Sequence, residues 1–307
     1  MTHTLFVYGT LLNGMGLWND LVGSPFLGHG IVAGVLYDLG GFPGLQEGTG
    51  SVYGELYEIS PEILNHLDEI EGYSPENPYS SLYLRKEISV QKFNEDFSVR
   101  AYSYFYNKSI ENIRKIPSGD YRRDRLEQPH DLSEAQQWYI AYGSNMDSTR
   151  LMKRLNLDHI PSADKEVGYL EGYALRFNKA ANNGTVYANI AYQGPGYRCP
   201  FVAYRLTQRH METLDRYEGE PFHYVRVGLP FPKADGTYGM GHIYMAHVEK
   251  LVPDRNPAAE YLEHLRRGYQ EHHFDPNDLD QCIHQCFQRP LFEDSCRVVR
   301  TWSLQRG

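Results

Sequence analysis

Short apolar runs that end at a glycine recur along the chain. Residues 5–8 and 138–142 are two such runs, and each is followed by glycine, which predicts buried strands that stop in a turn. Residues 51–59 alternate between apolar and polar side chains, as a strand with one exposed face does. Residues 83–90 and 224–229 are rich in β-branched and aromatic side chains, and we expect two more strands there.

Helical signals follow the strands. Ser60, Pro61 and Glu62 form a helix start, with a serine N-cap, a proline in the first turn and an acid near the positive helix end. Apolar positions 63, 64 and 67 give this helix one buried face. A second clear helix is expected over 257–265. Strands and helices in this order indicate an α+β fold.

The chain contains an internal repeat. Residues 57–72 recur as residues 204–219 at a constant offset of 147, with identical Tyr, Leu, Asp, Glu and Gly at matched positions. The strand and turn at 5–11 recur at 139–145 with an offset of 134, so the second copy holds 13 additional residues between its two pieces. The repeat predicts two tandem copies of one fold.

A polar stretch separates the two copies. Residues 107–137 contain Pro117, Gly119 and Pro129 and almost no β-branched run, which is typical of a domain exit and linker. We predict a first domain over 1–123, a linker over 124–136 and a second domain over 137–307.

Composition narrows the class of protein. Of 307 residues, 41% are apolar, which suffices for two cores, and the formal net charge of −9 makes nucleic acid an unexpected partner. No apolar run approaches the roughly 20 residues of a membrane helix, and the N-terminus lacks a secretory signal. Four cysteines, all in the second half, are too few for a disulfide scaffold. We therefore expect a soluble, reduced, cytoplasmic protein.

Two chemical features repeat together. A strand that ends in Tyr-Gly-Thr or Tyr-Gly-Ser presents backbone N–H groups that bind an anion or a carbonyl oxygen gaining charge. Glu71 and Glu218, in the motif Leu-Asp-x-x-Glu-Gly, end a helix next to the core, where burial raises the proton affinity of a carboxylate toward that of a general base. No G-x-S-x-G elbow appears, and no cysteine accompanies either copy of the two features, so the enzyme nucleophile is missing.

These motifs resemble those of the gamma-glutamylcyclotransferase family, which includes the AIG2-like proteins. The first copy, with the segments 7–11, 36–44, 67–72 and 119–121, resembles the gamma-glutamylamine cyclotransferase branch. The second copy, with the segments 141–146, 214–219, 257–262 and 267–272, is similar to the gamma-glutamyl peptide branch. The order and spacing of the motifs, found twice, make the resemblance specific.

The resemblance implies a fold and a reaction. Each domain would be a small mixed β-barrel flanked by helices. The substrate would be a small gamma-glutamyl amide or peptide, whose own α-amine attacks the γ-carbonyl to release 5-oxoproline and a free amine. This would explain the missing nucleophile. Glu71 and Glu218 would act as general base and then general acid, and no metal or cofactor is implied.

The resemblance also implies which residues hold the glutamyl head. Two loops would bind it through backbone N–H groups: Tyr8, Gly9, Thr10 and Leu11 in the first domain, and Tyr142, Gly143, Ser144 and Asn145 in the second. Tyr261 and Tyr121 would line the two pockets. Simple core packing is the alternative for the aromatic rings of Tyr8 and Tyr142.

Several alternatives stay open at this stage. Either glutamate could form a helix-end ion pair, one domain could be inactive, or the protein could bind gamma-glutamyl ligands without turnover. Hydrolysis to free glutamate is a further possibility, and neither the leaving amine nor the oligomeric state follows from the sequence. Cys282, His284, Cys286 and the pair His272-His273 invite a zinc interpretation, but their spacing does not offer four ligands, so a helix face is expected.

Overall fold

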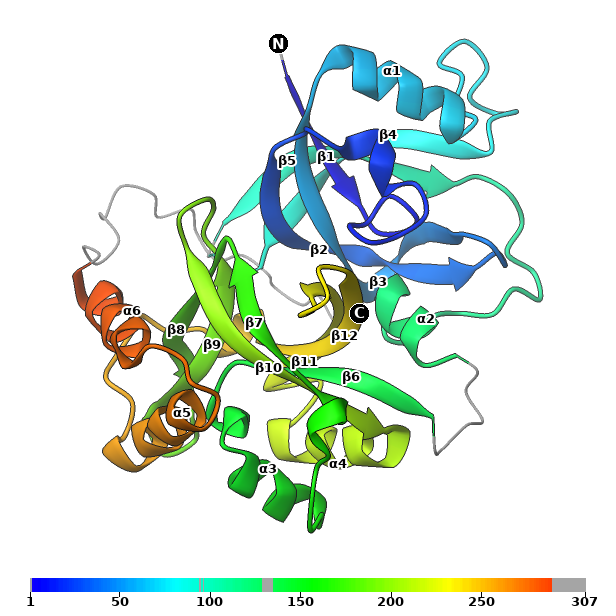
Figure 1. Ribbon diagram of the computed structural model, residues 1–307. Helices are drawn as coiled ribbons and strands as arrows, with labels where there is room; N and C mark the ends of the chain where they lie inside the picture. The colour runs from blue at the N-terminus through cyan, green and yellow to red at the C-terminus, as the bar shows by residue number, and fades with distance from the viewer. Residues whose placement is uncertain (1, 94, 96, 129–134, 289–307) are drawn as a thin grey trace.

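The computed structural model describes residues 2–93, 95, 97–128 and 135–288, and it divides them between two α+β domains (Figure 1). The first domain is the upper one in the view, coloured blue to blue-green. Its elements are β1 (His3–Val7), η1 (Trp18–Leu21), β2 (Phe26–Asp38), β3 (Pro43–Ile59), α1 (Pro61–Ile70), β4 (Tyr83–Lys92), β5 (Ser98–Tyr106) and α2 (Tyr121–Leu126).

The strands of the first domain form a closed barrel. The order around it is β1-β3-β2-β4-β5. β1 pairs antiparallel with β3 and parallel with β5, so the barrel is mixed, as predicted. Its interior holds fully buried apolar side chains such as Leu5, Phe6, Leu56 and Val90. The residues predicted to be strands in this domain lie in β1, β3 and β4, except for Tyr8, which directly follows β1.

The second domain repeats this pairing with more helices. Its elements are β6 (Gln136–Ala141), η2 (Ser144–Met146), α3 (Ser148–Leu155), η3 (Ser162–Asp164), β7 (Lys165–Glu171), β8 (Tyr173–Ala180), β9 (Val186–Tyr192), β10 (Arg198–Thr207), α4 (Gln208–Glu218), β11 (Tyr224–Pro232), β12 (Tyr238–Ala246), η4 (Val248–Lys250), α5 (Ala259–Glu271) and α6 (Pro276–Gln288). β6 pairs antiparallel with β10 and parallel with β12, as β1 does with β3 and β5. The strands divide into a five-stranded sheet, β11-β12-β6-β10-β7, and the hairpin β8-β9.

The helix that carries the repeat motif starts and stops in the same way in both domains. The hydroxyl of Ser60 accepts a hydrogen bond from the N–H of Ile63, and that of Thr207 accepts one from the N–H of His210, both at 3.3 Å. Gly72 and Gly219 then adopt positive φ angles of 61° and 66°, which favour glycine. α1 therefore ends at Ile70, with Glu71 as its C-cap residue, and α4 ends at Glu218. The two helices lie at opposite ends of the molecule in Figure 1.

The short helix α2 joins the domains. Arg122 forms a buried ion pair with Glu55 of β3 and donates a hydrogen bond of 3.1 Å to the carbonyl oxygen of Gly228 in β11. The carboxylate of Asp120 accepts a hydrogen bond of 3.2 Å from the N–H of Gly228. His29 and Tyr173 add a side-chain contact of 2.7 Å. Buried charged bonds of this kind fix the two domains against each other.

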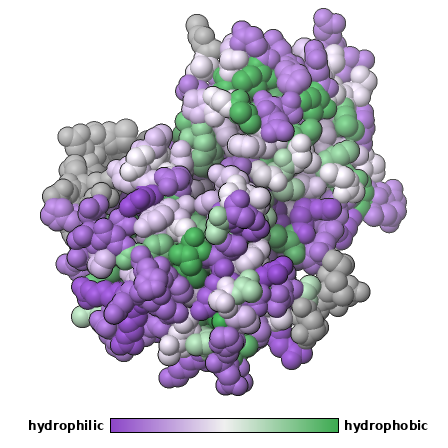
Figure 2. All heavy atoms as spheres, viewed as in Figure 1, coloured by the Kyte–Doolittle hydropathy of each residue, from purple (hydrophilic) through white to green (hydrophobic). Residues whose placement is uncertain are grey.

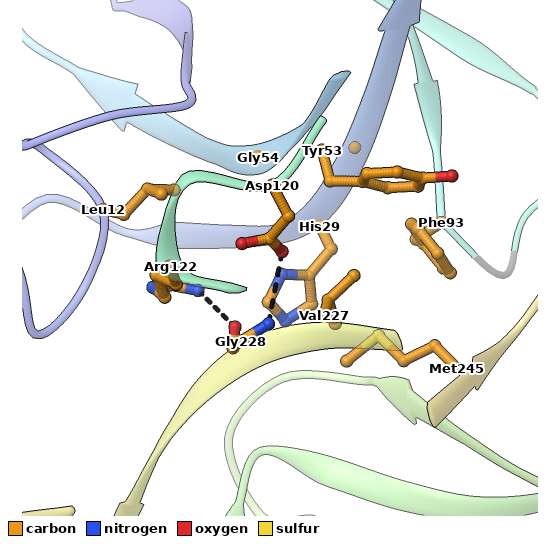
Figure 3. A pocket seen from close by; sticks show the side chains of 11 residues that line it. Leu12, His29, Tyr53, Gly54, Phe93, Asp120, Arg122, Val227, Gly228 and Met245 are labelled. Carbon is orange, nitrogen blue, oxygen red and sulfur yellow. Dashed lines mark hydrogen bonds between the residues drawn. The ribbon is translucent and has the colours of Figure 1, made fainter. Parts of the chain in front are cut away.

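A small cavity lies at this boundary. Residues of both domains line it, among them His29, Asp120 and Arg122 from the first and Gly228 and Met245 from the second (Figure 3). Its volume of about 10 Å³ is enough for roughly one water molecule, far below that of a ligand site.

The predicted linker over 124–136 overlaps described elements at both ends. α2 continues to Leu126 and β6 begins at Gln136, while residues 129–134 lie outside the described residues, as does the end of the predicted second domain, 289–307. Within the described part of the chain, none of the helices has the length and apolar character needed to cross a membrane.

Candidate active site

Glu71 lines a cavity of the first domain. α1 directs its end toward this cavity, and the N–H of Glu71 donates a hydrogen bond of 2.9 Å to Leu67. The cavity has a volume of about 270 Å³, close to the roughly 300 Å³ at which small-molecule sites begin. The lining residues are Phe6, Val7, Tyr8, Gly9, Thr10, Leu11, Leu17, Gly41, Phe42, Pro43, Ile70, Glu71, Leu82, Tyr83 and Tyr104. The predicted loop 8–11 and the predicted base Glu71 thus line one cavity.

The loop after β1 forms one wall of this cavity. A Cβ on Gly9 would lie 2.6 Å from Cγ of Pro43, so only glycine lets the two walls approach this closely. Within the described part of the chain, no protein acceptor is hydrogen-bonded to the N–H groups of Thr10 and Leu11. These two N–H groups are available to a ligand.

The environment of Glu71 is apolar. Burial raises the pKa of its carboxyl to about 7. The lining contains no lysine or arginine, and in the described structure the carboxylate accepts no hydrogen bond from a protein donor. Figure 2 shows hydrophobic side chains at several places on the upper, first-domain part of the surface; Leu17 and Phe42 of the cavity wall are 37% and 40% exposed. Glu71 therefore keeps a proton affinity suited to acid–base chemistry near neutral pH.

Tyrosine hydroxyls brace the cavity instead of pointing freely into it. Tyr8 donates a hydrogen bond of 2.6 Å to the carbonyl oxygen of Tyr104, and Tyr83 donates one of 2.6 Å to that of Pro43. Tyr121 donates to the carbonyl oxygen of Gly41 at 3.2 Å and supports the wall from behind, outside the described lining. The ring of Tyr8 is buried in the core and also lines the cavity. Core packing and a place in the pocket were the alternatives for this residue, and it has both.

The second domain has the same frame. Tyr142 donates a hydrogen bond of 2.6 Å to the carbonyl oxygen of Tyr244, and Tyr224 donates one of 2.7 Å to that of Ala188. A Cβ on Gly143 would lie 3.3 Å from that of Ala188. Ala188 thus takes the place that Pro43 holds in the first domain.

The aspartate of each motif holds the C-terminal end of its own helix, α1 or α4, through side-chain contacts. Asp68 accepts a hydrogen bond of 2.8 Å from Tyr104 and pairs with Arg85. Asp215 accepts one of 2.6 Å from Tyr244 and lies 3.0 Å from the Nε of Arg226. Each aspartate therefore ties its helix to the neighbouring strands.

Glu218 is held by polar partners, unlike Glu71. The amide of Asn145 and the guanidinium of Arg154 each donate a hydrogen bond of 3.1 Å to its Oε1. Arg154 also donates to Oδ1 of Asn145 at 2.9 Å. Burial raises the pKa of Glu218, whereas Arg154 and Asn145 act in the opposite direction. The predicted residues Asn145 and Glu218 are brought into direct contact.

Tyr261 reaches the same place from α5. Its hydroxyl accepts a hydrogen bond of 3.1 Å from the N–H of Ala188, and its oxygen would lie 3.4 Å from a Cβ on Gly143. Its ring packs against that of Tyr187. The structure therefore brings together Gly143, Ser144, Asn145, Glu218 and Tyr261, although they come from four separate elements or turns.

The residues weighed for zinc lie only in part within the described structure. No group of three or more His, Cys, Asp and Glu side chains converges there. Cys282 is buried, and nothing is described of the side chain of Cys286.

Sequence reasoning missed several residues around the two glutamates. Tyr83 and Tyr224 each open the strand after the repeat motif, two positions before Arg85 and Arg226. This Tyr-x-Arg pattern would have revealed them if the repeat had been extended past its glycine. The repeat could not have revealed Arg154 in this way, because α3, which carries it, has no counterpart among the described helices of the first domain.

Comparison with known proteins places these observations in a family. The model of the family "Gamma-glutamyl cyclotransferase, AIG2-like" matches residues 5–123 and again 139–263. The gamma-L-glutamyl-butirosin B gamma-glutamyl cyclotransferase of Niallia circulans is 33% identical over 135 residues, which cover 43% of this chain and 83% of that protein. The gamma-glutamylcyclotransferase family protein YtfP of Escherichia coli is 30% identical over 118 residues, covering 38% of this chain and 94% of YtfP.

The two-domain arrangement also has a solved counterpart. The crystal structure of YkqA from Bacillus subtilis superposes with a TM-score of 0.75 and 24% identity, covering 94% of this chain and 99% of YkqA. At this identity the likeness concerns the fold. With both copies of the repeat matched by the family model, the chain belongs to the AIG2-like gamma-glutamyl cyclotransferase family.

Proposed function

We propose that the protein converts gamma-glutamyl amides into 5-oxoproline and a free amine, with Glu71 as the general acid and base of the first domain. The observation that carries this proposal is Glu71 itself. It is a half-buried carboxyl whose pKa is raised to about 7 by desolvation, and it faces a cavity bordered by the free N–H groups of Thr10 and Leu11. The family membership of the chain supports the same reaction.

The reaction needs no enzyme nucleophile. Ionised Glu71 takes a proton from the substrate's α-ammonium, and the freed amine attacks the γ-carbonyl carbon. A carbon–nitrogen bond closes the five-membered lactam, and the bond from the same carbon to the leaving nitrogen breaks. Glu71 gives this proton to the departing nitrogen and, ionised again, takes the second proton from the ring nitrogen, which becomes the lactam N–H. The released amine finally carries both protons as an ammonium, so atoms and charge balance and no water is consumed.

The cavity contributes by orienting the substrate. The N–H groups of Thr10 and Leu11 would bind the developing oxyanion or the glutamyl carboxylate. Holding the amine against the γ-carbonyl lowers the entropic barrier to ring closure. The apolar walls exclude water, which disfavours the competing hydrolysis to glutamate.

We propose the same chemistry for Glu218 in the second domain. Its frame of Tyr142, Tyr224 and Gly143 matches that of the first domain, but its carboxylate is already bonded to Asn145 and Arg154. This ion pair favours binding without turnover as a second candidate function for that domain.

Product analysis of matched variants tests the proposal. Wild type, Glu71→Gln, Glu218→Gln and the double variant are incubated with a panel of gamma-glutamyl amines and dipeptides, and 5-oxoproline and glutamate are quantified by mass spectrometry. Glutamine keeps the shape of glutamate but cannot accept the proton, so each single variant should lose one activity by about 10²–10⁴-fold. Glu69→Gln, on the exposed side of α1, is the control and should match wild type.

Three results would speak against parts of the proposal. Wild-type activity in the double variant would remove both glutamates from the mechanism. Glutamate as the product would replace cyclisation by hydrolysis. If the Glu71→Gln variant binds gamma-glutamyl compounds but releases no 5-oxoproline, the second domain binds these compounds without turnover.

A further inference from the structure

The second domain collects more positive charge around its glutamate than Glu218 balances. Arg150 and Arg154 lie one turn apart on α3, and the positive charges of Arg154 and of Lys179 in β8 act on Glu218. The other nearby acid, Asp147, is engaged by Nδ1 of His264 at 2.8 Å. The cavity of the first domain has no lysine or arginine in its lining. A surplus of buried or half-buried cations calls for an anionic ligand.

Arg154 is the cation best placed to meet such a ligand. Its guanidinium bonds Glu218 and Asn145 at once and stacks over the ring of Tyr217, 5.0 Å from the ring centroid. The side chains of Arg154 and Glu218 are 18% and 16% exposed, so the pair lies at the edge of the site and remains accessible to solvent. Arg150 lies behind it, fixed to Nε2 of His264 at 2.9 Å, with a buried Nε that has no hydrogen-bond partner in the described structure.

The ion pair conflicts with the role of Glu218 as a base. A carboxylate that accepts a charged hydrogen bond holds a proton less readily than a free one. Glu218 can take up the proton of the α-ammonium more easily once Arg154 has moved to another anion. A guanidinium exchanges one carboxylate for another without losing its paired geometry.

The anion belongs on the leaving amine and not on the glutamyl head. Both domains present the same loop to the head, and the first domain does so with no cation in its cavity. The additional cations of the second domain therefore face the part of the substrate that differs. Resting on the function proposed above, we propose that Arg154 is a positioning and specificity-determining residue of the second domain: it holds Glu218 until a carboxylate on the leaving amine takes over its guanidinium.

A matched pair of substrates tests this inference. Gamma-glutamyl-alanine and gamma-glutamyl-alaninamide differ only in the charge of the leaving amine. In the Glu71→Gln protein, only the second domain can release 5-oxoproline, and we expect kcat/KM to favour gamma-glutamyl-alanine by at least about tenfold. Arg154→Gln should reduce this preference to near unity by raising the KM for gamma-glutamyl-alanine. Arg154→Lys should restore part of it.

The pH dependence separates positioning from a structural role. Glu218 is faced by Arg150 and Arg154 of α3, Lys179 of β8, Asn145 of η2 and the hydroxyls of Tyr139, Tyr142, Tyr224 and Tyr261. With gamma-glutamyl-alaninamide as substrate, Arg154→Gln should move the acid limb of kcat/KM to higher pH, because the cation that favours ionised Glu218 is gone. Lys153→Gln removes an exposed charge from the same helix and should change neither preference nor pH profile.

Calorimetry covers the case in which the second domain binds without turnover. In the Glu71→Gln, Glu218→Gln protein, gamma-glutamyl-alanine should bind at least about tenfold more tightly than its amide, and Arg154→Gln should abolish the difference. Equal kcat/KM or equal affinity for the two compounds overturns the role of Arg154 while the activity through Glu71 stands. Absence of 5-oxoproline from wild type with every gamma-glutamyl compound contradicts the proposed function itself.

Discussion

The two glutamates at the helix ends occupy equivalent positions in two different environments. Glu71 faces an apolar cavity without a cation, whereas Glu218 is bonded to Asn145 and Arg154. Both frames are otherwise built alike, from a buried tyrosine after the first strand, a second tyrosine opening the strand after the motif, and a close-packed glycine. A repeated fold thus preserves the geometry of a site while the charge around its acid changes independently.

The sharpest test of this comparison is the pH dependence of the two activities. Glu71 must be ionised to accept a proton, so the kcat/KM of the first domain should fall about tenfold per pH unit below pH 7, or about 10²-fold from pH 7 to pH 5. Arg154 favours ionised Glu218, so the acid limb of the second domain should lie at lower pH. Rate profiles of Glu218→Gln and Glu71→Gln report the two domains separately. Coinciding limbs would mean that the two environments do not set the proton affinities.

The close-packed glycines should respond unequally to alanine. A Cβ at Gly9 would meet the stiff ring of Pro43 at 2.6 Å, whereas one at Gly143 would lie 3.3 Å from Ala188. Gly9→Ala must displace the loop that carries the free N–H groups, and we expect a loss of about 10- to 10²-fold in kcat of the first domain. Gly143→Ala should cost the second domain less than about tenfold. Equal losses would contradict the tighter wall of the first domain.

The buried charge of Glu71 should also lower the stability of the protein at high pH. Its pKa is raised from 4.5 to about 7 on folding, so its destabilising effect appears as the pH rises through this window and is complete above pH 7. Glu71→Gln should therefore increase the free energy of unfolding at pH 8 by about 1–3 kcal/mol and leave it nearly unchanged below pH 4.5. Urea unfolding at the two pH values measures this difference.

Glu218→Gln serves as the contrasting variant in the same experiment. Glu218→Gln removes the negative charge that pairs with Arg154. The increase in the free energy of unfolding at pH 8 should therefore be smaller than for Glu71→Gln, or absent. A larger gain would show that the ion pair does not offset the burial of Glu218.

The smallest effect expected concerns the tyrosines that hold the motif aspartates. Tyr104→Phe and Tyr244→Phe each remove one buried hydrogen bond to a carboxylate, to Asp68 at 2.8 Å or Asp215 at 2.6 Å. Each should lower the free energy of unfolding by about 1–2 kcal/mol. Thermal unfolding of the two variants should show similar losses, and a marked inequality would argue against equivalent bracing.

The sequence was sufficient to predict the parts of the fold that depend on local signals. Ser60 and Thr207 cap their helices, Gly72 and Gly219 stop them, and the repeat brought Glu71 and the loop 8–11 into one hypothesis. The contacts of Glu218 could not be predicted in the same way. Arg154 reaches it from α3, 64 positions earlier in the chain, and only the packing of α3 against α4 determines that approach.

The link between the domains was equally hidden from sequence reasoning. Residues 124–126 belong to the predicted linker because the stretch is polar, and in the structure they complete α2, whose Arg122 and Asp124 side chains are buried. Composition cannot distinguish a polar helix in solvent from one whose charges are paired across a boundary, since pairing depends on Glu55 and Gly228, far away in the chain.

The place of Arg122 has a consequence for engineering. One guanidinium pairs with Glu55 on the barrel of the first domain and donates a hydrogen bond to the backbone of β11 at Gly228. A chimera that exchanges one domain at the polar stretch would leave the Arg122 guanidinium buried without one of its partners. Loss of the Glu55 carboxylate would lower the free energy of unfolding by about 3–5 kcal/mol. Crossover points for recombination should therefore keep α2 together with both β3 and β11, which makes the tandem pair a single unit of inheritance and not two interchangeable modules.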